Sequence, residues 1–278
     1  MRLSKLILCL VFLPCLAFAE SNYYLGASGV PASTITNYTQ DANCMGAWYM
    51  NLDAATSEID RTANGNDLAV SASDTIPQSA TVPAGYSGYS RTFAWGDVDY
   101  LRIADGTELD INGADQSITL AAWIYVTTAP ADNNQRGIIH KGDTGASNAQ
   151  YEMWLYGTGS SQFEIYFRVS NSSEDGTAWD SLSSITTTLA QNTWYHIVCV
   201  DNNTDMRIYI NGELNCVPLA KNDGIYNGNG LFYIGSMGGA NTISGNIDEP
   251  IVLNRALSST EVAALYANGI SGNKGGSD

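Results

Sequence analysis

Between residues 44 and 256 the chain is a series of short β-branched and aromatic runs, separated by Gly, Asn and Asp. Ile118 to Val126 alternates with a period of two, which places one set of apolar side chains on a single face: Ile118, Leu120, Ala122, Ile124 and Val126. Met206 to Ile210 also alternates and runs into Asn211-Gly212, a strong hairpin signal. A parallel sheet would need helices between its strands, so this spacing predicts an antiparallel all-β sandwich.

The stretch 245–262 predicts a buried strand that leads into a short helix. We expect the helix to run from Ser259 to about Ala267. Ser258 is placed to cap its first turn, and Glu261, three residues further on, completes a capping box. Gly269 is the expected stop. No other segment predicts a helix as clearly.

Residues 1–19 have the features of a signal peptide: a basic start, an apolar run from Leu6 to Leu16, and the small-x-small site Ala17-Phe18-Ala19. The apolar run is too short to span a bilayer. We therefore expect a secreted protein, extracellular or periplasmic, with no membrane insertion. Residues 20–40 are interpreted as a leader or linker, 41–270 as one domain, and 271–278 as a flexible tail.

The chain is strongly acidic, with 28 Asp and Glu against 12 Lys and Arg and a formal net charge of −16. This balance argues against nucleic acid or an anionic membrane surface as a ligand, because neither gains from contact with negative charge. The surplus of carboxylates fits calcium sites. Plain solubility in a salty extracellular setting explains it equally well.

Three cysteines follow the signal peptide: Cys44, Cys199 and Cys216. Export permits a disulfide, and the odd count leaves one thiol free or available for a covalent partner. Cys199 lies in an apolar strand and is interpreted as a small buried hydrophobe. Cys44 and Cys216 are the predicted bridge. No Cys-x-x-Cys motif suggests zinc or redox chemistry.

Several motifs in one order carry a family resemblance. They include Trp48-Tyr49-Met50, Asp97 to Ile103, Ala122-Trp123-Ile124, Trp194 to Val198 and Arg207 to Gly212. Together with 245–262 they resemble laminin G-like domains of the concanavalin A-like lectin/glucanase superfamily, over residues 44 to 269. The resemblance implies a two-sheet antiparallel jelly roll with one short C-terminal helix. Because this sandwich carries lectins, adhesion modules and glycosidases, function must be argued from sites.

The resemblance also implies a structural Ca²⁺ in the loop Asp60 to Asp67, close to the terminal strand. Its expected ligands are Asp60, Asn64, Asn66 and Asp248, since calcium takes several oxygen ligands at once. Asp97 and Asp99 form a rival cluster. Alternatively, Asp60 and Asn64 only make Asx turns and Asp248 only caps backbone N–H groups.

Two alternating runs, Tyr151 to Tyr156 and Phe163 to Val169, predict a hairpin with an aromatic outer face. If Tyr156 pairs with Glu164, then Trp154 faces Tyr166 and Glu152 faces Arg168. Such rings beside polar groups suit a sugar, and this gives a set of expected ligand-binding residues: Trp154, Tyr156, Tyr166, Glu152, Arg168 and Trp123. Trp123 belongs only if its strand lies in the same sheet. The alternative is a small second core covered by loops, with Trp179 among them.

Catalysis has little support. Glu58-Ile59-Asp60 begins like the carboxylate motif of sandwich glucanases but lacks its last carboxylate, and the pair Glu152 and Glu164 has Arg168 beside it. We therefore expect a non-enzymatic domain that binds a glycan or glycoprotein. A structural subunit of a surface layer, fibre or virion appendage, assembled by self-association, is the second hypothesis. A glycoside hydrolase or polysaccharide lyase is the third.

Overall fold

The computed structural model describes residues 37–274 except 54, 72–74, 105–108, 112–115, 143–148, 160, 172–177, 187, 222 and 273. The predicted signal peptide, most of the predicted leader and the last four residues of the predicted tail lie outside these ranges. Among the described residues, no helix combines the length and the apolar character needed to cross a membrane.

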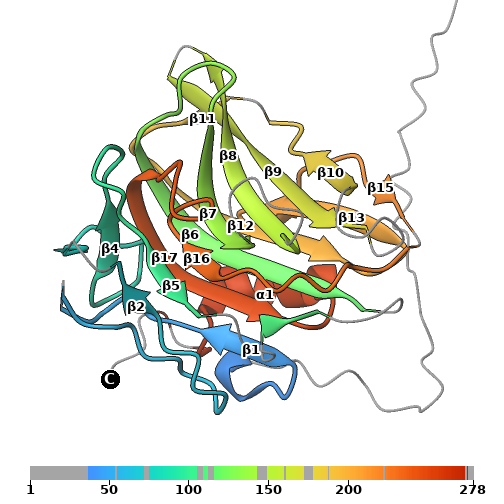
Figure 1. Cartoon of the computed structure of the whole chain (residues 1–278), viewed down its shortest axis with the longest axis horizontal. Helices are drawn as coiled ribbons and strands as arrows, with labels where there is room; N and C mark the ends of the chain where they lie inside the picture. The colour runs from blue at the N-terminus through green and yellow to red at the C-terminus, as the bar shows by residue number, and fades with distance from the viewer. Residues whose placement is uncertain are drawn as a thin grey trace, which may run out of the picture. The chain divides into compact units, whose positions relative to one another are not determined.

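The described residues form two antiparallel sheets, as Figure 1 shows. In spatial order the nine-stranded sheet contains β14 (Glu213–Leu214), β13 (Asp205–Ile210), β12 (Trp194–Asp201), β6 (Ile118–Thr128), β17 (Ser244–Leu253), β4 (Ser90–Phe93) and β3 (Gln78–Ser79), with β1 (Cys44–Ala47) on β17 and β15 (Leu219–Ala220) on β13. The eight-stranded sheet contains β10 (Trp179–Ser183), β9 (Gln162–Ser170), β8 (Tyr151–Gly159), β7 (Gln135–Lys141), β16 (Phe232–Ile234), β5 (Leu101–Ile103) and β2 (Ala69–Val70), with β11 (Leu189–Ala190) on β9. The predicted all-β sandwich is confirmed.

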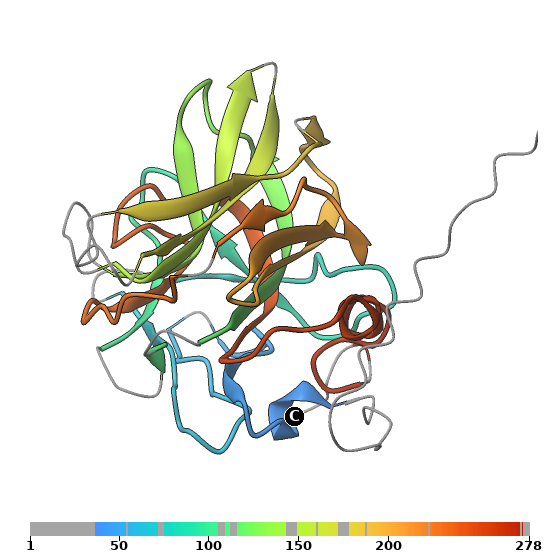
Figure 2. The ribbon, with the colours of Figure 1, turned by 90° about the vertical axis from the view of Figure 1, so that its right-hand side faces the viewer.

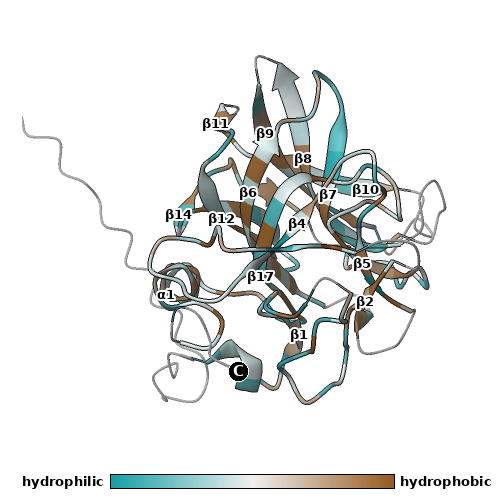
Figure 3. Ribbon diagram, turned by 90° about the vertical axis from the view of Figure 1, so that its left-hand side faces the viewer, coloured by the Kyte–Doolittle hydropathy of each residue, from teal (hydrophilic) through white to brown (hydrophobic). Residues whose placement is uncertain are grey.

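The main core lies between the sheets and is built by period-two alternation. All five apolar residues predicted to share one face of β6, from Ile118 to Val126, are buried in it. The other sheet contributes Met153 and Leu155 from β8 and Ile165 and Phe167 from β9. Brown hydrophobic residues appear on β6, β9 and β17 in Figure 3. The predicted inward faces are thus the observed ones.

The predicted turn and helix signals are also confirmed. Asn211 and Gly212 both have positive φ (53° and 84°), as a type I′ turn requires, and they join β13 to β14. Helix α1 (Ser259–Asn268) begins with the expected capping box between Ser258 and Glu261 and ends at Gly269. These features depend on neighbours in sequence, which is why the sequence predicts them well.

A second core covers the outer face of the nine-stranded sheet. The alternate residues of its strands point away from the main core. Among them, Ala121, Val198 and Ile251 share a cluster with Val262 and Leu265 of α1. The 3-10 turn η1 (Tyr38–Gln40) closes the same side, and Tyr38 is buried there. Figure 2 shows α1 in red and the N-terminal segment in blue. Tyr38, which sequence analysis assigned to the leader, therefore packs with the domain.

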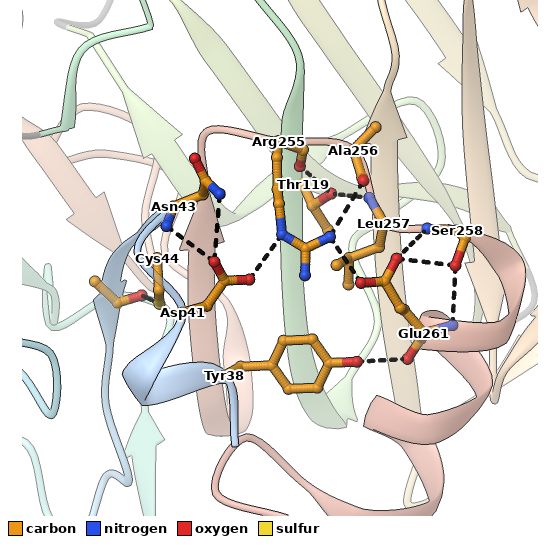
Figure 4. A network of polar contacts seen from close by, with 11 residues as sticks. Tyr38, Asp41, Asn43, Cys44, Thr119, Arg255, Ala256, Leu257, Ser258 and Glu261 are labelled. Atoms are coloured by element: carbon orange, nitrogen blue, oxygen red, sulfur yellow. Dashed lines mark hydrogen bonds and ion pairs between the residues drawn. The ribbon is translucent and has the colours of Figure 1, made fainter. Parts of the chain in front are cut away.

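A network of polar contacts around Arg255 connects the N-terminal segment, α1 and β6 on this side of the sheet (Figure 4). Its Nε lies 2.7 Å from Asp41 Oδ2, and its Nη1 lies 2.8 Å from Glu261 Oε1. The Tyr38 hydroxyl donates a hydrogen bond of 2.9 Å to the Glu261 carbonyl, while Thr119 on β6 donates to the Arg255 carbonyl at 2.8 Å. Segments from both ends of the domain are thereby held against β6.

The predicted Cys44–Cys216 disulfide is not formed, because the two thiols lie in different cores. Cys44 belongs to the second core and Cys216 to the main core, so the nine-stranded sheet lies between those cores. All three described cysteines are free and buried. Cys199 is a buried core residue, as predicted, and burial raises its thiol pKa well above the usual value.

We predict that Tyr38→Ala lowers the free energy of unfolding by about 3 kcal/mol or more, because it removes a buried aromatic side chain. Tyr38→Phe is the matched control. It removes only the hydroxyl bond to Glu261 and should cost about 1 kcal/mol. Urea unfolding of both variants measures the difference. Equal stability of Tyr38→Ala and wild type would mean that residues 37–40 are not part of the folded domain.

Candidate functional site

The structure brings the residues of the Asp60 loop together, but mainly through their own hydrogen bonds. Asp60 Oδ1 accepts from the N–H groups of Ala47 (3.2 Å) and Thr62 (2.9 Å). Its Oδ2 accepts from the Thr62 hydroxyl (2.7 Å) and the Asn66 N–H (2.9 Å). Four donors thus occupy the carboxylate that was expected to bind calcium. The bond from the Thr62 N–H forms the Asx turn offered as the alternative.

The amides of this loop point nitrogen, and not oxygen, toward the neighbouring backbone. Asn64 Nδ2 donates to the carbonyls of Cys44 (2.8 Å) and Met45 (3.1 Å), and Asn66 Nδ2 donates to Met45 (2.7 Å). Calcium requires converging oxygens. No group of three or more His, Cys, Asp or Glu within the described ranges is arranged to hold a metal ion. As arranged here the loop does not fit calcium, and calcium binding stays a prediction.

Asp248, the fourth expected ligand, lies in a buried acidic pair on β17. Its Oδ1 accepts the Glu249 N–H at 2.9 Å, which is the backbone contact of the alternative reading. Burial, and then the charge of Glu249, raise the Asp248 pKa well above its usual value. Burial raises the Glu249 pKa to about 7, although the Ile270 N–H and the Tyr86 hydroxyl bond its carboxylate. Asp248 and Glu249 therefore hold protons that exposed carboxyl groups would release.

The predicted aromatic hairpin has the predicted register. Tyr156 pairs with Glu164, Trp154 with Tyr166, and Glu152 with Arg168. The Trp154 and Tyr166 rings stack with centroids 5.1 Å apart. Five of the six expected ligand-binding residues thus share the outer face of the eight-stranded sheet.

The part of this aromatic face around Trp154 is closed. Trp154 is only 2% exposed. The Arg168 guanidinium lies 4.9 Å from the centroid of Trp154 and 4.2 Å from that of Trp179 on β10, so it fills the space between the two rings. Tyr156 and Tyr166 keep partly exposed side chains. The Trp154 ring itself packs as the second small core that the sequence offered as the alternative.

Trp123, the sixth residue, does not join this face because β6 belongs to the other sheet. Its Nε1 donates to the Tyr86 hydroxyl at 2.9 Å, and its ring lies 5.0 Å from that of His196. His196 is buried, and burial lowers its pKa to about 3, so the imidazole is neutral. Trp123 is therefore part of a buried aromatic group beside α1, where its ring lies 5.5 Å from Tyr266.

The carboxylates on the aromatic face are not arranged for glycoside hydrolysis. Glu152 forms an ion pair with Arg168, and its Oε1 lies 3.0 Å from His140 Nδ1. These partners lower the Glu152 pKa despite burial, which opposes a role as a general acid. Glu164 lies opposite Tyr156, four residues along the strand from Glu152. That offset is about 13 Å, beyond the usual separation of the two catalytic carboxyl groups.

A hollow of about 400 Å³ lies at one end of the sandwich, where the two sheets meet. Thr128 at the end of β6 and Ser244 at the start of β17 line it from the nine-stranded sheet. Arg136 on β7 lines it from the other sheet. Trp95, in the turn after β4, completes it with a side chain that is 63% exposed. We call this site the Trp95 hollow.

Two glycines allow the loops that line the Trp95 hollow to pack closely against the strands. A Cβ on Gly157 would lie 2.1 Å from the Ala131 carbonyl oxygen, and one on Gly137 would lie 2.3 Å from the Ser236 backbone. The Gly137 N–H also donates to the Asn241 carbonyl at 2.9 Å. The loops that carry Ala131 and Asn241, both of which line the hollow, can therefore pack directly on β8 and β7.

The chemistry of the Trp95 hollow suits a polar ligand with an apolar face. The Arg136 guanidinium lies 4.6 Å from the Trp95 ring centroid, and the backbone N–H of Trp95 donates to Ser244 Oγ at 3.2 Å. The side-chain amides of Asn134 and Asn241 make no hydrogen bond within the described residues, so both are available to a ligand. Burial lowers the pKa of Arg136 from its ordinary value.

Sequence reasoning did not find this hollow. Its residues come from four segments, around positions 95, 128–136, 241 and 244, and none of them forms a recognisable motif. Trp95 lies in the segment Ala94-Trp95-Gly96-Asp97. The only unusual feature of this segment is an aromatic residue beside residues that favour turns. That exposed tryptophan in a turn is the one clue the sequence offers.

A family model described as the concanavalin A-like lectin/glucanases superfamily matches residues 96–263, more than half of the chain. The chain belongs to this superfamily. The match confirms the resemblance drawn from the motifs. A search of curated proteins finds no match.

Several solved structures of similar fold are binding domains. The binding domain of botulinum neurotoxin serotype G matches with a TM-score of 0.61 at 13% identity, over 83% of this chain and 54% of that domain. Domain 4 of the extracellular arabinanase AbnA from Geobacillus stearothermophilus matches with a TM-score of 0.57 at 16% identity, over 81% and 98%. The ligand-binding domain of botulinum neurotoxin serotype D matches with a TM-score of 0.56 at 14% identity, over 84% of this chain and 54% of that chain. The chain thus spans about half the length of the toxin domains. These identities establish the superfamily's fold and no more.

We predict that stability falls as pH rises from about 4.5 to about 7. In this range the native state keeps the Glu249 proton that the unfolded chain has released, so stability is lost as pH rises toward the native pKa. The share of this loss that comes from Glu249 is on the order of 3 kcal/mol, and Glu249→Gln should remove that share. The raised pKa of Asp248 adds a loss of the same sign, which remains in the variant. Urea unfolding at pH 5 and pH 8 tests this, with exposed Glu213→Gln as control. A wild-type stability that rises over this range would contradict the assignment.

We predict that two tryptophan truncations lower the stability by very different amounts. Trp154→Ala should cost about 3–5 kcal/mol, because it empties a buried site between strands. Trp95→Ala should cost less than about 1 kcal/mol, since the exposed ring gives up only its contact with Arg136. Thermal and urea unfolding of both variants provide the comparison. A small loss for Trp154→Ala would mean that the aromatic face is open after all.

Proposed function

We propose that this chain is a non-catalytic carbohydrate-binding domain that works outside the cell, and that the Trp95 hollow holds the sugar. The observation that carries the proposal is an exposed indole at a concave site with unused amide groups beside it. An aromatic face packs on the apolar side of a sugar ring, while amides bond its hydroxyls. Export is inferred from the signal-peptide features of residues 1–19.

The similar structures support this class of ligand. The arabinanase domain was solved with arabinotriose, and the serotype D toxin domain with N-acetylneuraminic acid. Both are sugars bound by domains of the same fold. The toxin domains are about twice the length of the matched region, so their ligands support a class and not a position on this chain.

The absence of catalysis is inferred from the carboxylates. Glu152 is paired with the Arg168 guanidinium and contacts the His140 ring, and Glu164 is too far along the strand to work with it. Calcium stabilisation has weaker support than glycan binding, because four donors from the protein already occupy Asp60.

The second hypothesis, a structural subunit that assembles with copies of itself, has one specific observation in its favour. Ile185, Leu214 and Val217 are exposed apolar side chains near β14, an edge strand of the nine-stranded sheet. Unpaired edges and apolar patches favour association. A mass in solution that grows with protein concentration, without any sugar present, would favour this hypothesis.

We predict that the folded domain retains glycans on an array and that Trp95→Ala weakens retention more than about tenfold with little change in melting temperature. Tyr89→Ala is the matched control, because Tyr89 is another exposed aromatic side chain but does not line the hollow. It should bind as wild type does. Retention that is unchanged in Trp95→Ala would place the sugar elsewhere, and an array without hits would exclude the proposed function.

A further inference from the structure

The Trp95 hollow is positively charged in a strongly acidic protein. Among the described residues that line it there is one arginine and no aspartate or glutamate, although acidic residues outnumber basic ones 28 to 12 in the chain. A site lined at random in this chain would carry carboxylates more often than guanidinium groups. The local charge is therefore opposite in sign to that of the whole protein.

The charge of Arg136 has no counter-ion among the residues that the structure describes. Other buried basic groups face carboxylates: Arg91 pairs with Glu58 at 2.5 Å, and Lys221 lies 3.1 Å from Asp223 and 3.3 Å from Asp201. Arg136 makes no ion pair with any described residue. Its one hydrogen bond runs from Nη1 to the Gln135 carbonyl at 2.6 Å.

This leaves several donors without a protein acceptor. A guanidinium carries five N–H groups in a planar fork, and only one of those of Arg136 is used within the described residues. The Trp95 ring covers one face of the group at 4.6 Å, which fixes its plane beside the hollow. Arg136 is only 7% exposed. A buried cation gains more from an anion than a solvated one does, because water screens it less.

We propose that the Trp95 hollow selects acidic sugars, in which a carboxylate or sulfate on the ring pairs with Arg136. This inference rests on the proposed function and adds a ligand class to it. Trp95 packs against the sugar ring, and Asn134 and Asn241 bond its hydroxyls. A neutral sugar leaves the Arg136 donors unpaired and binds more weakly.

The test is an array that carries acidic glycans beside matched neutral ones: oligogalacturonates with their methyl esters, and dextran sulfate fragments with unsulfated dextran. We expect each acidic form that binds to be preferred over its neutral partner by roughly tenfold or more. The two pairs distinguish carboxylate from sulfate. Arg136→Gln should abolish the preference, Arg136→Lys should keep part of it, and Trp95→Ala should weaken acidic and neutral forms alike.

A second measurement needs no variant. Binding of an acidic glycan to the wild-type domain should weaken as NaCl rises from about 50 to about 500 mM, roughly one third and three times the physiological ionic strength. Binding of a neutral glycan should not change. Equal affinity for paired acidic and neutral glycans, or an acidic preference that Arg136→Gln leaves intact, would overturn the inference while keeping glycan binding. No binding to any glycan would overturn the proposed function itself.

Discussion

Burial of the nine-stranded sheet on both faces is the constraint on which the rest of the structure depends. Strand β6 lies between β12 and β17, so its backbone groups are paired on both edges, and its side chains alternate between two cores. Ala121 faces the second core while Leu120 and Ala122 face the main core. Such a strand is stable only if both of its faces are covered, because the hydrophobic gain scales with the area removed from water. The eight-stranded sheet provides one cover, and α1 with η1 provides the other.

The second cover is small, and polar contacts position it. Arg255 joins Asp41 to Glu261, which lie 220 residues apart in the chain, and Thr119 fixes the same loop to β6. Partly buried ion pairs of this kind add little net stability, because desolvation offsets much of the attraction. Their directional bonds select one arrangement of two short segments that apolar packing alone would leave loosely defined. The apolar contacts of Tyr38, Val262 and Leu265 then contribute the stability.

The sequence predicts what depends on neighbours or on period two. Alternation predicted which side chains of β6, β8 and β9 face the main core. The register of the β8–β9 hairpin followed from one assumed pair, Tyr156 with Glu164. The capping residues of α1 were predictable because they are neighbours in the sequence. What failed depends on contacts between distant segments. Cys44 and Cys216 are two cysteines of a chain for which the sequence predicts export, but their side chains lie on opposite faces of the nine-stranded sheet. Nothing in the sequence indicates that β1 and the segment after β14 direct these two residues to different faces. The Trp95 hollow needs four segments brought to one end of the sandwich, so its residues carry no joint signal before folding.

The location of the Trp95 hollow follows from how the faces of the sheets are used. Both inner faces form the main core, the outer face of one sheet lies under α1, and the outer face of the other carries Trp154, Arg168 and Trp179 packed on one another. Little room for a ligand is left along the strands. At the end of the sandwich the strands stop, and loops expose side chains on a rigid base, which is where recognition residues usually lie. Arg136 is costly there, since burial disfavours an unpaired charge. An unpaired buried charge lowers the stability of the domain without ligand. Such a charge is expected where a bound anion offsets that cost.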